Sequence, residues 1–81
     1  MDKAKIREAV VKVITTIAPD VSADELTPEI DLRADLDIDS MDFLNIVVGL
    51  HEKLQVDIPE ADYSRLTTLD AFTDYLSDKL G

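Results

Sequence analysis

The chain has 81 residues, 18 acidic and 8 basic side chains, a formal net charge of −10 and no cysteine. This length supports one domain, residues 1–81, around a single core, and the lack of cysteine excludes disulfides, zinc–thiolate sites and cysteine nucleophiles. The negative charge repels nucleic-acid phosphates, and no apolar run approaches the roughly 20 residues that cross a bilayer. We therefore expect a cytoplasmic monomer with no nucleic-acid partner and no membrane insertion, which binds partners through their basic patches.

A helix is predicted over residues 3–18, and this region is the one with a basic excess. Its apolar residues recur at helical spacing and form one stripe: Ile6, Val10, Val13, Ile14 and Ile17. Pro19 ends the pattern. Residues 1–18 carry four basic and two acidic side chains, whereas the rest of the chain carries 4 basic and 16 acidic ones.

The connection from Pro19 to Asp39 is 21 residues long, whereas helix links in bundles usually take about 2–8. "SADE" at residues 22–25 matches a capping box and predicts one helical turn. Apolar residues punctuate the rest of the connection, and we expect them to hold it across the helices: Val21, Leu26, Ile30, Leu32, Leu36 and Ile38. An ordered long loop that ends at a helix start is a common place for a binding or modification site.

Two more long helices are predicted, over residues 40–54 and 69–80. Apolar residues cover most sides of the first, because Leu44, Ile46 and Val48 widen the stripe of Phe43, Val47, Leu50 and Leu54. Such a helix is either centrally buried or borders a cavity. The second has one apolar face and either Thr67 or Thr68 as its cap.

"PEADYSRL" at residues 59–66 predicts a short helix, with Pro59 tolerated in its first turn. Strand signals are weaker than the helical periodicity throughout. The predicted fold class is all-α: a small antiparallel four-helix bundle of three main helices and one short helix, with a long first loop.

The aspartates before residue 40 invite comparison with a calcium loop. Asp35, Asp37 and Asp39 fit positions 1, 3 and 5 of an EF-hand. The glycine required at position 6 is Ser40, and the bidentate glutamate required at position 12 is Ile46. We predict no metal site here, although loose screening of the carboxylates by divalent cations stays open.

A catalytic serine is a second interpretation of Ser40. Such a serine needs a base within hydrogen-bond reach, and the single histidine, His51, lies eleven residues along the same predicted helix. That separation is about 16 Å. The chain also lacks a G-x-S-x-G elbow, so we predict no catalytic activity.

A third interpretation makes Ser40 an attachment point. Free N–H groups and the positive end of the helix dipole favour a phosphate at a helix start. The simpler alternative is that Ser40 or Asp39 only caps the helix. On this alternative the protein is a small acidic helical interaction module, and a response to divalent cations stays open.

The run "LDIDSMDFLNIVVGLHEKLQVDIP" at residues 36–59 resembles the signature of acyl carrier proteins, with D-S-M at the head of the second helix and "IP" before a short helix. The resemblance extends along essentially the whole chain. It implies a four-helix bundle without catalytic activity of its own. It further implies that a phosphopantetheinyl transferase attaches 4′-phosphopantetheine from coenzyme A to Ser40, between Asp39 and Met41. Acyl groups then travel as thioesters on the arm, which supplies the thiol that the chain lacks.

The resemblance also implies partners and a place for the acyl chain. Acyl-loading, acyl-transfer and condensing enzymes with basic docking patches are expected to contact Asp37, Asp42, Glu52 and Asp57. Candidates to shelter an acyl chain are Ile46, Val47, Leu50, Leu54, Leu66, Phe72 and Leu76; an ordinary packed core is the alternative.

The second helix departs from the acidic pattern of fatty-acid carriers at Asn45, His51 and Lys53. This departure disfavours the general fatty-acid partners and favours a specialised stand-alone carrier of a polyketide, modified-lipid or aminoacyl pathway. The resemblance implies a role in fatty-acid, polyketide or related lipid biosynthesis. An aminoacyl or peptidyl carrier remains an alternative.

Overall fold

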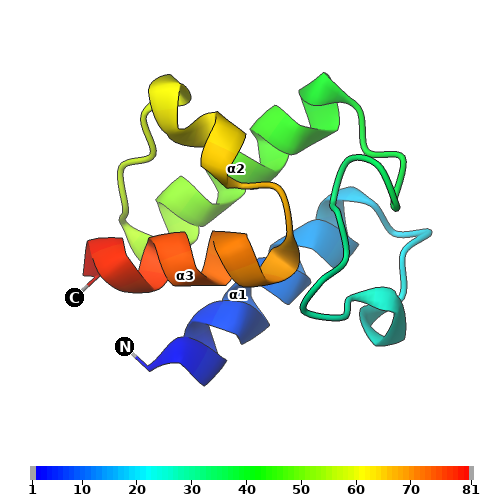
Figure 1. The fold of residues 1–81 in the computed structure, drawn as a ribbon, viewed down its shortest axis with the longest axis horizontal. Coiled ribbons are helices and arrows are strands. Elements are labelled where there is room, and N and C mark those ends of the chain that lie inside the picture. The colour runs from blue at the N-terminus through cyan, green and yellow to red at the C-terminus, as the bar shows by residue number, and fades with distance from the viewer. Residues whose placement is uncertain (1, 81) are drawn as a thin grey trace.

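The computed structural model describes residues 2–80, and the regular elements of the protein in this range are helices. In chain order they are α1 (Lys3–Ile17), the 3₁₀ turn η1 (Ala23–Glu25), α2 (Ser40–Leu54), the short 3₁₀ helix η2 (Glu60–Arg65) and α3 (Leu69–Leu80). The predicted fold class, a small bundle of three main helices and one short helix, is confirmed (Figure 1). The predicted bounds of α2 and α3 are those observed, and α1 ends one residue early.

α1 lies against both other long helices (Figure 1). Arg7 donates to Asp70 at 3.1 Å, and Lys3 forms an ion pair with Asp74, so α1 and α3 run antiparallel. On the other side of α1, the backbone at Gly49 of α2 faces the Val13 side chain. A Cβ atom at residue 49 would stand 2.9 Å from Val13 Cγ1, so the glycine permits this close approach of α1 and α2.

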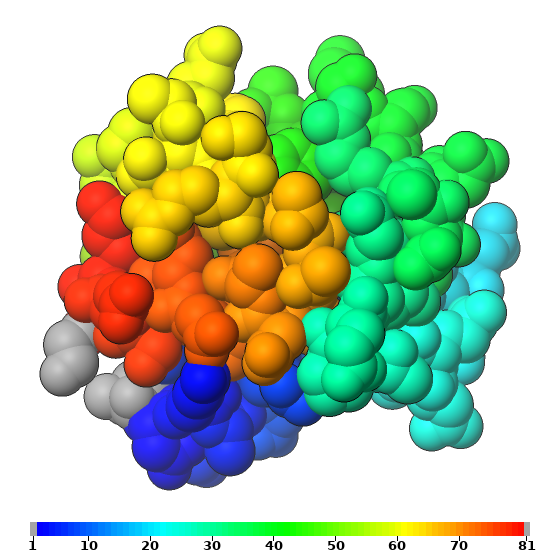
Figure 2. Space-filling model, viewed as in Figure 1, coloured from blue at the N-terminus to red at the C-terminus, as the bar shows by residue number. Residues whose placement is uncertain are grey.

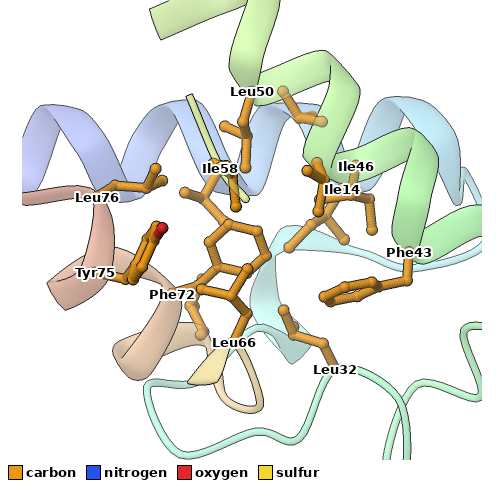
Figure 3. Packing of buried hydrophobic residues seen from close by; sticks show 14 of the residues in the cluster. Ile14, Leu32, Phe43, Ile46, Leu50, Ile58, Leu66, Phe72, Tyr75 and Leu76 are labelled. Atoms are coloured by element: carbon orange, nitrogen blue, oxygen red, sulfur yellow. The ribbon is translucent and has the colours of Figure 1, made fainter. Parts of the chain in front are cut away.

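The core lies where the three helices meet, and Figure 3 shows its central part. Phe72 is fully buried, and its ring centroid lies 6.3 Å from that of Phe43. Phe43 also meets Tyr63 of η2 edge-on at 5.7 Å. Full burial of such side chains is worth about 1.5–3 kcal/mol each, so this cluster is the main stabilising element of a small domain.

Local hydrogen bonds define the helix starts. The Asp2 carboxylate accepts the Lys5 N–H at 2.9 Å, and the Thr68 hydroxyl accepts the Ala71 N–H at 3.0 Å. Thr68 is therefore the cap of α3, which resolves the choice between Thr67 and Thr68. Glu25 Oε2 accepts the Ser22 N–H at 2.8 Å, as the predicted capping box requires.

The long first loop is ordered by backbone pairing to the segment before α3. The Leu32 N–H donates to Thr67 O at 3.0 Å, and the Leu69 N–H donates to Ile30 O at 3.2 Å. Leu26, Leu32 and Ile38 are buried, as expected for anchors of the loop. Figure 2 shows this loop, in cyan to green, covering one side of the molecule.

Within residues 2–80, no helix combines the length and the apolar character needed to pass through a bilayer.

Candidate functional site

The start of α2 presents Ser40 with a free hydroxyl. Asp39, not Ser40, is the N-cap: its Oδ1 accepts the Asp42 N–H at 2.9 Å, and its carbonyl accepts the Phe43 N–H at 2.9 Å. Ser40 is the first residue of the helix, is exposed, and its hydroxyl has no hydrogen bond within residues 2–80. The interpretation of Ser40 as a cap is therefore wrong, and its side chain is available for chemistry.

The helix end beside Ser40 suits a phosphate group. The N–H groups of Ser40 and Met41 lie in the first turn, where no carbonyl of the helix can reach them. Together with the positive end of the helix dipole they favour an anion attached at the first residue. The Asp39 carboxylate accepts the Asp42 N–H, whereas the Ser40 and Met41 N–H groups have no acceptor within residues 2–80 and can serve a phosphodiester.

The chain enters this helix through a fixed turn. Asp37 adopts a left-handed conformation with φ of 55°, which aspartate tolerates better than most residues. Ile38, the next residue, is buried at 5% exposure. The turn at Asp37 and the anchor at Ile38 together set where Asp39 and Ser40 stand at the surface.

The remaining aspartates of the cluster order the loop. Asp31 Oδ1 accepts the N–H groups of Arg33 and Ala34 at 3.0 and 2.9 Å, and Asp35 Oδ2 accepts the Asp31 N–H at 2.9 Å. These carboxylates act as turn caps. In the described part of the chain, no three histidine, aspartate or glutamate residues gather in a way that could hold a metal ion.

His51 lies near the opposite end of α2 from Ser40. Its Nδ1 is 2.8 Å from the Val56 carbonyl oxygen, just beyond the end of the helix. The rise of the helix separates it from Ser40 by about 16 Å. A serine–histidine pair is therefore not formed.

A patch of exposed apolar side chains follows Ser40 along α2, and the sequence interpretation missed it. Met41, Leu44 and Val48 are 69%, 42% and 45% exposed. Their spacing of three and four residues places them on one face of the helix. The apolar excess of α2 was predicted to be buried or to line a cavity; for Leu44 and Val48 this is wrong, because they face solvent. We call these three residues the apolar stripe.

The predicted partner residues fall into two places. Asp37 and Asp42 flank Ser40, with Asp37 exposed and Asp42 half-buried. Glu52 and Asp57 are exposed near the other end of α2. Glu52 lies one turn beyond Val48 on the same face of α2, so a negative charge follows the apolar stripe.

The predicted acyl-pocket residues also divide. Six are core residues with at most 4% exposure, five of which are labelled in Figure 3: Ile46, Val47, Leu50, Leu66, Phe72 and Leu76. Leu54 is half-buried and lines a groove on the outside of the bundle, between α1 and α2. A shelter for an acyl chain would thus require the six core residues to move apart.

Comparison with known proteins gives the same interpretation of the bundle. A family signature described as "Phosphopantetheine attachment site" matches residues 4–76. The chain belongs to the acyl carrier protein family. The family's cofactor is 4′-phosphopantetheine, and a free exposed hydroxyl at a helix start, as at Ser40, fits a covalent phosphodiester.

Individual relatives support this assignment. An acyl carrier protein of Rubrobacter xylanophilus is 33% identical over 73 residues, which cover 86% of this chain and 90% of the relative. Polyketide-8 synthase acyl carrier protein 2 of Streptomyces avermitilis is 35% identical over 81 residues, which cover 100% of this chain and 87% of the relative. An acyl carrier protein of Picosynechococcus is 34% identical over 62 residues, covering 76% of each. Members of this family are carriers.

Proposed function

We propose that this protein carries acyl groups on a 4′-phosphopantetheine arm attached to Ser40 Oγ. The observation that carries the proposal is that Asp39, and not Ser40, caps α2. The Ser40 hydroxyl is exposed and makes no hydrogen bond within residues 2–80. When bound, the arm supplies a terminal thiol that holds acyl groups as thioesters. The chain itself has no cysteine.

Ser40 needs a transferase for loading. His51 is about 16 Å away, and the Asp39 carboxylate is engaged in the cap. A phosphopantetheinyl transferase therefore supplies the base that takes the hydroxyl proton. Ser40 Oγ forms the new bond to phosphorus, and the remainder of coenzyme A leaves with the electrons of the broken P–O bond.

The apolar stripe and the nearby acids form the docking face for partner enzymes. Three apolar side chains lead away from Ser40, with Asp37 and Asp42 beside the attachment point and Glu52 and Asp57 farther along. Apolar contacts supply affinity, and the acids steer basic patches on loading, transfer or condensing enzymes. We expect the carrier to act as a monomer in the cytoplasm.

The pathway is a specialised one. The helix α2 holds Asn45, His51 and Lys53 where more acidic residues would suit the general enzymes of fatty-acid synthesis. We infer that dedicated enzymes of a polyketide, modified-lipid or related pathway are the partners. The full-length similarity to a polyketide synthase carrier supports this inference.

Charge reversal tests the acidic part of the docking face. Asp37→Lys and Asp42→Lys should slow loading by the transferase, and the slowing should diminish with salt because the Debye length falls to about 3 Å at 1 M. Asp20→Lys, in an exposed part of the first loop, is the matched control. Equal rates for all three variants would contradict a docking face around Ser40.

Intact mass spectrometry tests the attachment site. After incubation with coenzyme A and a broad-specificity phosphopantetheinyl transferase, the wild type should gain one phosphopantetheine. Ser40→Ala should gain none, whereas Ser64→Ala, at an exposed serine of η2, should load normally. A wild type without adduct, or a Ser40→Ala variant that still loads, would leave only an acidic helical interaction module or a different attachment residue.

A further inference from the structure

A groove with a basic rim lies between α1 and the last turn of α2. It has a volume of about 700 Å³ and is open to solvent. A hollow of about 270 Å³ continues it along the two helices and shares Lys12, Thr16 and Lys53 with it. Lys53 lies thirteen residues after Ser40, which is about 20 Å along the helix, so the groove is separate from the attachment site.

The lysines of this groove are the basic side chains that lack a charged or aromatic partner among residues 2–80. The other five basic side chains have partners: Lys3 with Asp74, Arg7 with Asp70, Arg33 over Phe43, and both Arg65 and Lys79 over Tyr75. Lys5, Lys12 and Lys53 have neither an ion pair nor an aromatic contact within residues 2–80. All three line the groove, where Glu8 is the one acidic residue.

The floor of the groove is apolar. The apolar lining residues are Ala9, Val11 and Leu54 in the larger part and Val13, Ile17 and Gly49 in its continuation. The glycine keeps the continuation hollow, since a side chain at residue 49 would project toward Val13. The Thr15 and Thr16 hydroxyls donate back to carbonyls of α1, which leaves their oxygens able to accept. Cations on the rim and apolar side chains below match an amphipathic anion.

Helix geometry gives the spacing of a matching ligand. Lys5 and Lys12 are seven residues apart on α1, which puts them about two turns, or about 10 Å, apart along one face. A helix with carboxylates seven residues apart and apolar side chains between them presents the complementary pattern. We propose that the α1–α2 groove docks an acidic amphipathic helix of a partner protein.

This occupant fits better than a second copy of the chain. Apart from the apolar stripe of α2, the apolar side chains of the helices are turned into the core, and two chains of charge −10 repel each other. A partner helix needs only a local match, because at about 0.15 M salt the Debye length is about 8 Å and the distant aspartates are screened. The groove would bind an acidic partner, whereas the face around Ser40 is expected to bind partners with basic patches. Binding in the groove does not require the phosphopantetheine arm.

A designed peptide tests the proposal. The probe is a fluorescent helical peptide of about four turns, with two glutamates seven residues apart and leucines between them on the same face. The control peptide carries lysines in place of the glutamates. Titration of ¹⁵N-labelled protein at about 0.15 M salt should shift amide resonances between Lys5 and Thr16 and around Lys53, and the control peptide should not.

Matched charge reversals complete the test. Lys12→Glu/Lys53→Glu should weaken peptide binding by about tenfold, from loss of two surface charge pairs and the added repulsion. Lys3→Glu/Lys79→Glu changes the net charge by the same amount, but at residues outside the groove. It should weaken peptide binding by less than about twofold. Ser40→Ala should bind as the wild type does. Circular dichroism checks that each variant remains helical.

Four results would overturn the proposal. They are equal weakening by both double variants, shifts centred on the apolar stripe, equal binding of the lysine peptide, or no shift up to about 1 mM peptide. Binding of vesicles rich in phosphatidylglycerol with these groove shifts, in place of peptide binding, would assign the groove to a lipid surface instead.

Discussion

The Asp39 carboxylate accepts the Asp42 N–H at 2.9 Å, and the neighbouring Ser40 hydroxyl makes no hydrogen bond within residues 2–80. Asp2 caps α1 in the same way, accepting the Lys5 N–H at 2.9 Å. The two aspartates therefore have the same structural role, and only Asp39 stands beside the attachment residue. Comparing substitutions at Asp39 and Asp2 therefore distinguishes the effect of losing a helix cap from the effect of losing a contact with the transferase.

Substitution of the two caps should give different functional results. Asp39→Ala and Asp2→Ala should each lower the free energy of unfolding by about 0.5–2 kcal/mol, whereas the asparagine variants retain the cap and should change it little. Asp39→Asn should still slow loading of Ser40, because the transferase loses one charge contact, and Asp2→Asn should not. Urea denaturation and loading kinetics measure the two effects. Normal loading of Asp39→Asn would limit Asp39 to a capping role.

The apolar stripe should matter for transfer and little for folding. Leu44→Glu and Val48→Glu alter side chains that are 42% and 45% exposed, so the free energy of unfolding should change by about 0.5 kcal/mol. Acyl transfer to or from a partner enzyme should slow by about fivefold or more, equivalent to about 1 kcal/mol at an interface. Ala4→Glu, exposed on α1, is the control. Unchanged kcat/KM for the stripe variants would exclude this face.

Tyr75 should make the fold sensitive to alkaline pH. Burial, followed by the 2.6 Å hydrogen bond to Asp62, raises the pKa of Tyr75 to about 12, above its ordinary value near 10. Between about pH 10 and pH 12 the unfolded chain loses this proton and the folded chain keeps it, so stability present below pH 10 is lost as pH rises.

Tyr75→Phe should flatten this pH dependence. The urea midpoint should decrease more between about pH 9 and pH 11 in the wild type than in the variant. Asp62→Asn removes the carboxylate but leaves the ring buried, so its decrease should be intermediate. Parallel pH profiles for the wild type and Tyr75→Phe would show that other groups govern the alkaline loss.

Acyl sheltering should appear in the core residues and not at Leu54. Each buried CH₂ contributes about 0.8 kcal/mol, which offsets the separation of packed side chains around Phe72 and Leu50. Lengthening the acyl chain on Ser40 should raise the melting temperature and shift amide resonances of the six core candidates. Shifts confined to the start of α2 would mean that the chain remains outside.

Local sequence signals were enough to predict the elements. The 3.6-residue periodicity, Pro19 and the threonines before α3 predicted helices that the structure confirms, because these signals act within a few residues. The D-S-M motif likewise identified Ser40 as the candidate site, and the family match supports that interpretation. Ser40 as the attachment residue remains a prediction until loading is measured.

Tertiary packing decided the features that involve distant residues. Only the arrangement of α2 against α1 and α3 determines which of its many apolar side chains are buried, so the exposure of Leu44 and Val48 was not foreseen. The sequence offered both Asp39 and Ser40 as caps of α2, and the structure assigns the cap to Asp39. Lys12 and Lys53 share a groove because two helices distant in sequence meet at Gly49. Hydrophobic periodicity specifies a helix and its apolar arc, but contacts between helices select the part of that arc that faces the core.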